Sequence, residues 1–330
     1  MKKIIAAALL AVLSLTGCAE QEYSTSFYAM DTFMTITAYG SKAQQAATEA
    51  EQYINSLEAK ISRTRKNSEL SALAGGEPAE LSEDTAELLR TALEMAEQTD
   101  GRFDPTVAAL SDLWQIGKEG QRVPDSADIA QALGTVGYRN IRLDGTTAQM
   151  TGGAKLDLGG IGKGYAADRT VEILKKNGVK RAVIALGGNI YAMGSRSRDQ
   201  GWKIGITDPD KAEEYVATVE ISDTSVVTTG DYERYFEQDG KRYHHVFDPE
   251  TGYPVESDLR SVTVVREQSA QADALSTALF VMGYEAAAEY CEQHDIAAVF
   301  IRNDHTICTS TALERCAVFE VTSAEYRYEK

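Results

Sequence analysis

The sequence has few of the residues that bind zinc and few basic residues. Its 330 residues include four cysteines and four histidines, and none of these forms a Cys-His cluster, which argues against a zinc site. Acidic residues outnumber basic ones by 50 to 33, giving a net charge of −17 at pH 7. Such a surface repels nucleic acid and anionic lipid, so we expect no nucleic-acid partner. Any local basic cluster is therefore a candidate anion site.

The chain also lacks an apolar run long enough for a comfortable membrane span. The run Ile4–Leu13 is shorter than the roughly 20 residues that a spanning helix needs. Lys2-Lys3 precedes it and the lipobox Leu15-Thr16-Gly17-Cys18 follows it, an order that indicates a lipoprotein signal peptide. We predict cleavage before Cys18 and diacylation of that cysteine, which anchors a protein stably.

These signals predict the organisation and the location of the mature chain. No low-complexity linker is present, so we predict a signal peptide 1–17, a lipidated polar tether 18–26 and a single folded domain 27–330. The location would be the extracytoplasmic side of a bacterial cell envelope. Loss of Lys2 and Lys3 leaves 31 basic against 50 acidic residues, so lipid on Cys18 must provide the anchoring.

Three cysteines remain in the mature chain. Cys291, Cys308 and Cys316 have no paired metal-binding spacing, and we interpret them as small core residues. A disulfide between two of these cysteines is an open alternative, because an exported protein meets an oxidising environment.

One stretch, Leu156–Asp168, carries the strongest local signal. A short apolar strand ends at Asp157, a turn dense in glycine and containing Lys163 follows, and a helix should then run to about Lys176. Glycine N–H groups and a helix N-terminus can bind phosphate. The spacing matches neither a P-loop nor a G-x-G-x-x-G fingerprint. A phosphate-binding turn and a plain strand-to-helix turn with a solvated lysine therefore stay equally open.

The remaining patterns predict an α+β fold with mixed, largely antiparallel sheets and packed helices. Asp144-Gly145 and Asp239-Gly240 are hairpin turns between alternating strands, while 43–57 and 270–282 have helical spacing, the latter with Ser269 as its cap. Hairpins and helices are mixed without strict βαβ alternation, which indicates the α+β class. The basic run 60–66 is interpreted as a solvated loop slightly in preference to a ligand-contact loop.

Two further pairs could support chemistry. Asp273 and Thr277 are four residues apart and share one helical face, an arrangement that suits a hard cation such as Mg²⁺. An aspartate in a first helical turn is more commonly a partner of the helix dipole. His245 and Asp248, close to a turn, could act as a base and its orienting group, although a surface histidine in a hairpin explains them equally well.

Seven blocks, taken together and in order, resemble the ApbE-type flavin transferases (FAD:protein FMN transferases) over nearly the whole mature chain. Asp31 departs from the family pattern, which usually has glycine there. The blocks are Met30-Asp31-Thr32, Asp100-Gly101-Arg102-Phe103-Asp104-Pro105-Thr106, Asp157-Leu158-Gly159-Gly160-Ile161-Gly162-Lys163-Gly164-Tyr165, Gly187-Gly188-Asn189, Thr228-Thr229-Gly230-Asp231-Tyr232, His245-Val246-Phe247-Asp248-Pro249 with Thr251-Gly252, and Ala272-Asp273-Ala274-Leu275-Ser276-Thr277.

The resemblance implies an enzyme that moves FMN from FAD to a Thr or Ser hydroxyl of an exported acceptor protein and releases AMP. It makes 27–330 the catalytic domain, with FAD as substrate and Mg²⁺, or alternatively Mn²⁺, as cofactor. The metal ligands would be Asp273, Thr277 and the Gly160 carbonyl. The residues expected at the FAD site are Met30, Arg102, Phe103, Asp104, Asp157, Lys163, His245 and Phe247.

Phosphoryl transfer depends on positioning and charge stabilisation, which gives three residues expected catalytic roles. Lys163 can stabilise charge on the phosphoryl oxygens, His245 is the first candidate base and Asp248 the second. An FAD pyrophosphatase producing FMN and AMP would use the same site with water as nucleophile. A flavin-binding or scavenging lipoprotein is the non-enzymatic alternative. The Asp273-Thr277 pair argues against it, because a protein that only stores flavin needs no metal at the pyrophosphate.

Overall fold

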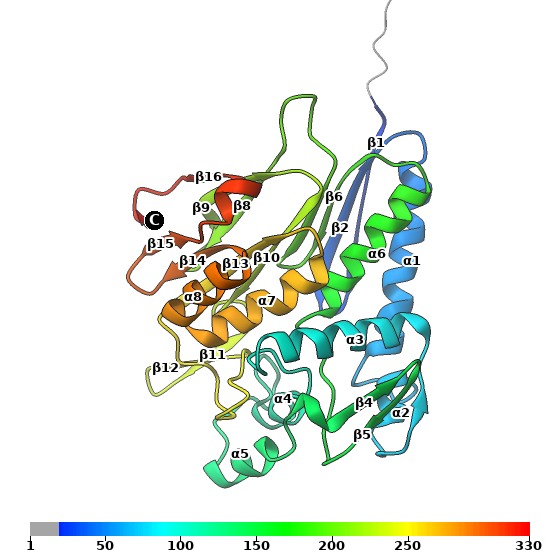
Figure 1. Ribbon diagram of the computed structural model, residues 1–330, viewed down its shortest axis with the longest axis vertical. Helices are drawn as coiled ribbons and strands as arrows, with labels where there is room; N and C mark the ends of the chain where they lie inside the picture. The colour runs from blue at the N-terminus through cyan, green and yellow to red at the C-terminus, as the bar shows by residue number, and fades with distance from the viewer. Residues whose placement is uncertain (1–19) are drawn as a thin grey trace, which may run out of the picture.

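The computed structural model describes residues 20–330 and is built around a nine-stranded sheet (Figure 1). Neighbouring strands are antiparallel except for the parallel pair β15 and β17. In spatial order the strands are β1 (Glu22–Ala29), β2 (Thr32–Tyr39), β6 (Arg181–Leu186), β7 (Asn189–Met193), β10 (Thr224–Gly230), β13 (Leu259–Arg266), β14 (Ala297–Arg302), β15 (Thr306–Thr309) and β17 (Arg327–Glu329).

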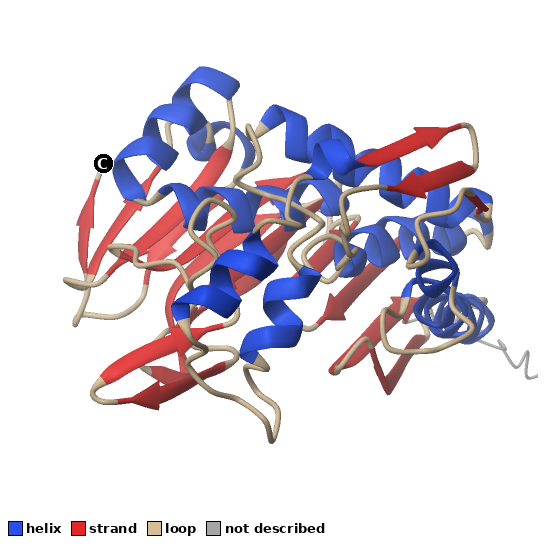
Figure 2. Cartoon of the chain, turned by 90° about the horizontal axis from the view of Figure 1, so that it is seen from below, coloured by secondary structure: helices blue, strands red, loops and turns tan. Residues whose placement is uncertain are grey.

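Helices cover one face of this sheet and a three-stranded sheet covers part of the other (Figures 1 and 2). Side chains alternate along β14 because strands have a period of two: Phe300 packs under the helices and Val299 under the small sheet. The helices are α1 (Ala43–Ile61), α3 (Glu83–Gln98), α6 (Gly162–Lys176), α7 (Ser269–Met282) and α8 (Tyr284–His294), and the small sheet contains β16 (Val318–Val321), β9 (Lys211–Ile221) and β8 (Trp202–Asp208).

A smaller apolar cluster contains Trp114, which is completely buried. It joins α4 (Ala108–Trp114) and α5 (Ser126–Leu133) to the hairpin of β11 (Tyr235–Gln238) and β12 (Lys241–His244). The remaining elements are α2 (Glu69–Leu73), β3 (Ala79–Glu80), the 3-10 helix η1 (Tyr138–Asn140), β4 (Ile141–Asp144), β5 (Thr147–Met150) and α9 (Leu313–Cys316).

The predicted α+β class is confirmed, as are the hairpins at 144–145 and 239–240 and the helix that ends at Lys176. The predicted tether is wrong from residue 22 onward, because β1 begins there and pairs with β2 along its whole length. The signal peptide and Cys18 lie outside the described residues. Among residues 20–330, no helix is both long enough and apolar enough to cross a membrane.

Two finer expectations also need correction. Ser269 is the first residue of α7, and its hydroxyl donates to Asn189 Oδ1 at 2.7 Å instead of capping the helix. The core assignment of the cysteines holds for Cys291 and Cys308 and is wrong for Cys316, which is exposed. All three thiols are free in the structure.

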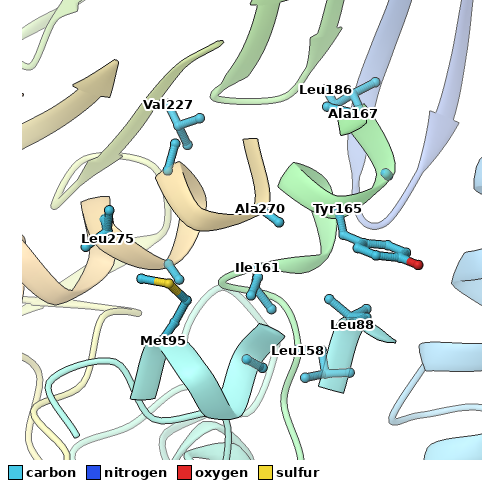
Figure 3. Packing of buried hydrophobic residues seen from close by; sticks show 14 of the residues in the cluster. Leu88, Met95, Leu158, Ile161, Tyr165, Ala167, Leu186, Val227, Ala270 and Leu275 are labelled. Atoms are coloured by element: carbon cyan, nitrogen blue, oxygen red, sulfur yellow. The ribbon is translucent and has the colours of Figure 1, made fainter. Parts of the chain in front are cut away.

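The first turn of α6 lies directly against the first turn of α7. Gly164 makes this approach possible, since a Cβ there would lie 2.3 Å from the Ser269 carbonyl oxygen and 2.6 Å from Ala270 Cα. Figure 3 shows Leu158 and Ile161, which precede α6, close to α3 and to the start of α7 at Ala270. The glycine turn is therefore fixed on both sides by packed apolar side chains.

Gly164→Ala should lower the free energy of unfolding by about 2 kcal/mol, because the added methyl group forces two packed backbones apart. Denaturant unfolding measures the change. Gly75→Ala is the matched control, because a Cβ at Gly75 meets nothing within 4 Å and its φ is not positive. Equal stability of the two variants would show that α6 and α7 are not closely packed at Gly164.

Candidate active site

Two adjoining cavities of about 650 Å³ and 130 Å³ form one cleft at the N-terminal ends of α6 and α7. Both cavities are lined by Ser111, Asp157, Gly159, Lys163, Gly188, Glu233, Arg234, His245 and Phe247. The cleft brings together nearly all the residues predicted from the sequence, which are Met30, Arg102, Phe103, Asp104, Asp157, Gly160, Lys163, His245, Phe247, Asp273 and Thr277.

The predicted metal ligands lie at the junction of α6 and α7. Asp273 is buried, and its Oδ2 accepts a hydrogen bond of 2.9 Å from the Gly164 N–H. Its Oδ1 lies 3.9 Å from Lys163 Nζ, which also donates to the Gly159 carbonyl at 3.2 Å. A carboxylate, a cation and a helix N-terminus therefore meet at one point.

Thr277 and Gly160 complete this group of polar atoms. Thr277 follows Asp273 by one turn of α7, and a Cβ on Gly160 would lie 3.7 Å from Thr277 Oγ1. Residues 20–330 contain no cluster of three or more His, Cys, Asp or Glu side chains suited to a metal. The oxygen-only set of one carboxylate, one hydroxyl and one carbonyl nevertheless fits a hard cation that keeps several waters, such as Mg²⁺.

Asp157 holds the glycine turn and orients a basic side chain. Its Oδ1 accepts from the Gly159 N–H at 3.0 Å, and its Oδ2 accepts from Ser111 Oγ at 3.2 Å. Arg63 Nε lies 3.3 Å from the same Oδ2, and Arg63 lines the larger cavity. The interpretation of the basic run as a solvated loop is therefore wrong for Arg63, and no sequence signal beyond the run itself identified that residue.

The block at residues 102–104 shapes the smaller cavity. Asp104 accepts hydrogen bonds from the N–H groups of Thr106 and Tyr138, each at 2.8 Å, so its carboxylate holds two loops together. Burial raises the pKa of Asp104, while these hydrogen bonds act in the opposite direction. Phe103 packs against Gly160, with Cε2 3.2 Å from the position of a Cβ there. Arg102 pairs with an exposed glutamate, Glu250.

His245 presents an unused polar atom at the cleft. Its Nδ1 is buried and has no hydrogen-bond partner within residues 20–330. Burial, together with the nearby charges of Arg234 and Lys163 and the neighbouring His244, lowers the pKa of His245 to about 3. The imidazole is therefore neutral at physiological pH, and it can accept a proton.

Asp248 does not share this position. It lines neither cavity, and its carboxylate accepts hydrogen bonds from the Glu250 N–H at 2.9 Å and Thr251 Oγ1 at 3.1 Å. These contacts hold the tight turn that follows β12. The expectation that Asp248 orients His245 or acts as a second base is not supported by its position, and we leave it out of the mechanism.

Sequence reasoning missed two charged residues that line both cavities, Glu233 and Arg234. They directly follow the block 228–232, so their position beside a recognisable motif was the available signal. Burial raises the pKa of Glu233, while Lys163 and Arg234 lower it. Burial outweighs the two cations, so the pKa of Glu233 is raised overall.

The cleft places Lys163 and the start of α6 beside a glycine turn. The ApbE family profile matches residues 30–300, and the chain belongs to this family.

Similar proteins cover most of the chain. An FAD:protein FMN transferase of Treponema pallidum is 34% identical over 89% of this chain and 88% of its own. One of Klebsiella pneumoniae is 39% identical over 72% of this chain and 75% of its own. The structure of the ApbE protein of Thermotoga maritima matches with a TM-score of 0.84 and 33% identity, covering 90% of this chain and 99% of that protein.

The lowered pKa of His245 makes acid destabilise the fold. The unfolded chain takes up a proton near pH 6.5 and the folded chain only near pH 3, so the stability contribution is present above pH 6.5 and lost as the pH falls from there. At pH 5 the loss should be about 2 kcal/mol relative to pH 7.5. Urea unfolding of His245→Asn should show a correspondingly smaller difference between the two pH values. The same acid loss in both proteins would contradict a neutral His245.

Proposed function

We propose that this chain transfers FMN from FAD to a hydroxyl group of a protein and releases AMP. The observation that carries the proposal is that one cleft combines the α6–α7 junction, bearing Lys163, Asp273 and Thr277, with His245, whose Nδ1 has no hydrogen-bond partner in the described part of the chain. Membership of the ApbE family supports it, as do the relatives named FAD:protein FMN transferase. The acceptor group is a Thr or Ser hydroxyl of an exported protein.

In this reaction the hydroxyl oxygen attacks the phosphorus of the FMN half, and the pyrophosphate P–O bond to AMP breaks. Negative charge accumulates on the phosphoryl oxygens, where Lys163 and the N-terminal N–H groups of α6 can stabilise it. Asp273, Thr277 and the Gly160 carbonyl would hold Mg²⁺ or Mn²⁺. When bound, the metal would supply Lewis acidity and fix the pyrophosphate.

His245 takes the proton of the attacking hydroxyl. A base with a pKa of about 3 is weak, but an anion bound beside it favours the imidazolium form and raises that pKa. The neutral side chain can therefore enter the reaction unprotonated and gain basicity once FAD is bound. Met30 and Phe247 line the larger cavity, which we assign to the flavin end of the substrate.

The direct test incubates the protein with FAD, Mg²⁺ and the acceptor proteins of its relatives. Flavin fluorescence of a denatured acceptor, with stoichiometric AMP, is the expected result. Free FMN and AMP in equal amounts, with no labelled acceptor, would instead identify an FAD pyrophosphatase. FAD that binds without being cleaved would indicate a storage protein.

Asp273→Ala should reduce metal-supported transfer strongly, because it removes the only charged ligand of the proposed metal site. The expected loss is on the order of 3 kcal/mol of barrier, roughly a hundredfold in rate. Thr277→Ala should reduce the transfer rate less, since water can replace a neutral ligand. Both variants should bind FAD with about the affinity of the wild-type protein. A near wild-type rate for Asp273→Ala in EDTA-treated, Mg²⁺-restored buffer would remove the metal from this site.

His245→Asn should lower the turnover of FAD-saturated enzyme while FAD affinity changes little, because proton transfer is needed only in the transition state. General-base catalysis contributes typically 10²–10⁴-fold, so at least a hundredfold loss is expected. The dissociation constant of FAD, measured by flavin fluorescence, is the control. Weakened FAD binding with unchanged turnover would make His245 a binding residue.

We also propose that the enzyme is a lipoprotein anchored on the extracytoplasmic side of a bacterial membrane through Cys18. The motif Leu15-Thr16-Gly17-Cys18 supports this location. Cys18→Ala should leave the protein unprocessed or released, with its catalytic domain folded, as fractionation and immunoblotting would detect. Processed mutant protein in the membrane fraction at the wild-type level would refute the anchor.

A further inference from the structure

The outer face of the β1–β2 hairpin is hydroxyl-bearing along most of its length and aromatic next to its tip. Two cross-strand hydroxyl pairs, Ser24 with Thr37 and Ser26 with Thr35, occupy most of it at Oγ–Oγ distances of 3.0 and 2.9 Å. The next cross-strand pair is Tyr28 and Phe33, which are 59% and 77% exposed. Their rings meet edge to face, with centroids 5.4 Å apart.

This aromatic pair, Tyr28 and Phe33, borders the active-site cleft. Of the four residues between the two aromatics in the sequence, three line the larger cavity: Met30, Asp31 and Thr32. Met30 and Asp31 have φ values of 49° and 59°, so the tip is a tight two-residue turn, and the Tyr28–Phe33 pair lies one cross-strand pair away from it. Exposed apolar side chains gathered next to a binding site indicate an interaction surface.

We propose that Tyr28 and Phe33 form the contact on which the acceptor protein docks, an inference that rests on the proposed transfer to a protein. The accepting hydroxyl must reach the cleft, so the segment that carries it must pass the rim. The occupant is an acceptor segment with an apolar side chain near its accepting Thr or Ser. Aromatic anchors commonly dominate protein interfaces because they bury large area with little loss of side-chain freedom.

The position of the pair favours a protein over a membrane surface. The chain enters β1 at Glu22, at the end of the hairpin where the Gly40 N–H donates to the Gln21 carbonyl at 2.8 Å. The eight residues of β1 span about 26 Å at 3.3 Å per residue, so the tip lies that far from the entering chain (Figure 1). An anchor at Cys18 would thus hold the opposite end of the hairpin at the bilayer.

The test replaces both aromatics by serine, which extends the hydroxyl pattern of the same face. With an acceptor protein of a relative that the wild-type chain labels, the double variant Tyr28→Ser with Phe33→Ser should raise the KM for acceptor at least tenfold. The FAD dissociation constant and the turnover at saturating acceptor should change less than twofold. Phe33→Tyr should retain wild-type KM. Val318→Ser is the matched control, because Val318 is 68% exposed on β16 of the other sheet.

The outcomes separate this inference from the proposed function. Failure of the wild-type chain to label any acceptor refutes the proposed function. An unchanged acceptor KM in the double variant, with labelling by the wild type intact, overturns the docking contact alone. Loss of binding to phospholipid vesicles by the double variant, with acceptor KM unchanged, would assign the pair to the membrane and also overturn it.

Discussion

The site depends on the close approach of two helix N-termini that each supply a carboxylate to the other. Asp273 of α7 accepts from the Gly164 N–H of α6, and Asp168 of α6 accepts from the Ser269 and Ala270 N–H groups of α7. This reciprocal arrangement satisfies backbone donors that a helix start leaves free. It also brings the positive ends of two helix dipoles to one point.

The cleft of this otherwise acidic protein holds several cations and the start of a helix. Lys163, Arg63 and Arg234 line the larger cavity together with the N-terminus of α6. Asp31, Glu58, Asp157 and Glu233 line the same cavity, and of these Asp157 pairs with Arg63. Asp273, in the smaller cavity, accepts a hydrogen bond from the Gly164 N–H. Within a partly enclosed cleft these fields are screened less than on the surface, so the net charge of the chain does not decide what binds.

The sequence predicted local features well because their causes are local. Asp-Gly dipeptides form the hairpin turns, and the glycine-dense stretch after Asp157 starts α6 as expected. The ordered motifs also identified most of the cleft, although they lie on six or more elements. Asp248 was misassigned because a carboxylate beside a turn can bind the turn backbone as easily as it can orient a histidine.

What the sequence could not reveal depends on partners distant along the chain. The cap of α7 comes from Asp168, a hundred positions upstream, so Ser269 was chosen as the nearest candidate. Arg63 became a site residue only through its contact with Asp157, and β1 formed only because β2 offers an edge with which it pairs. Such long-range contacts have no signature in local composition or periodicity.

The claim that the α6–α7 junction holds a metal against the pyrophosphate is tested most directly by anomalous diffraction. Crystals of the protein with FAD and Mn²⁺ should show one anomalous peak within about 2.3 Å of both Asp273 Oδ1 and Thr277 Oγ1, in contact with the Gly160 carbonyl and a phosphate oxygen. A peak elsewhere in the cleft, or FAD bound at full occupancy with no peak at the junction, would contradict this account of the site.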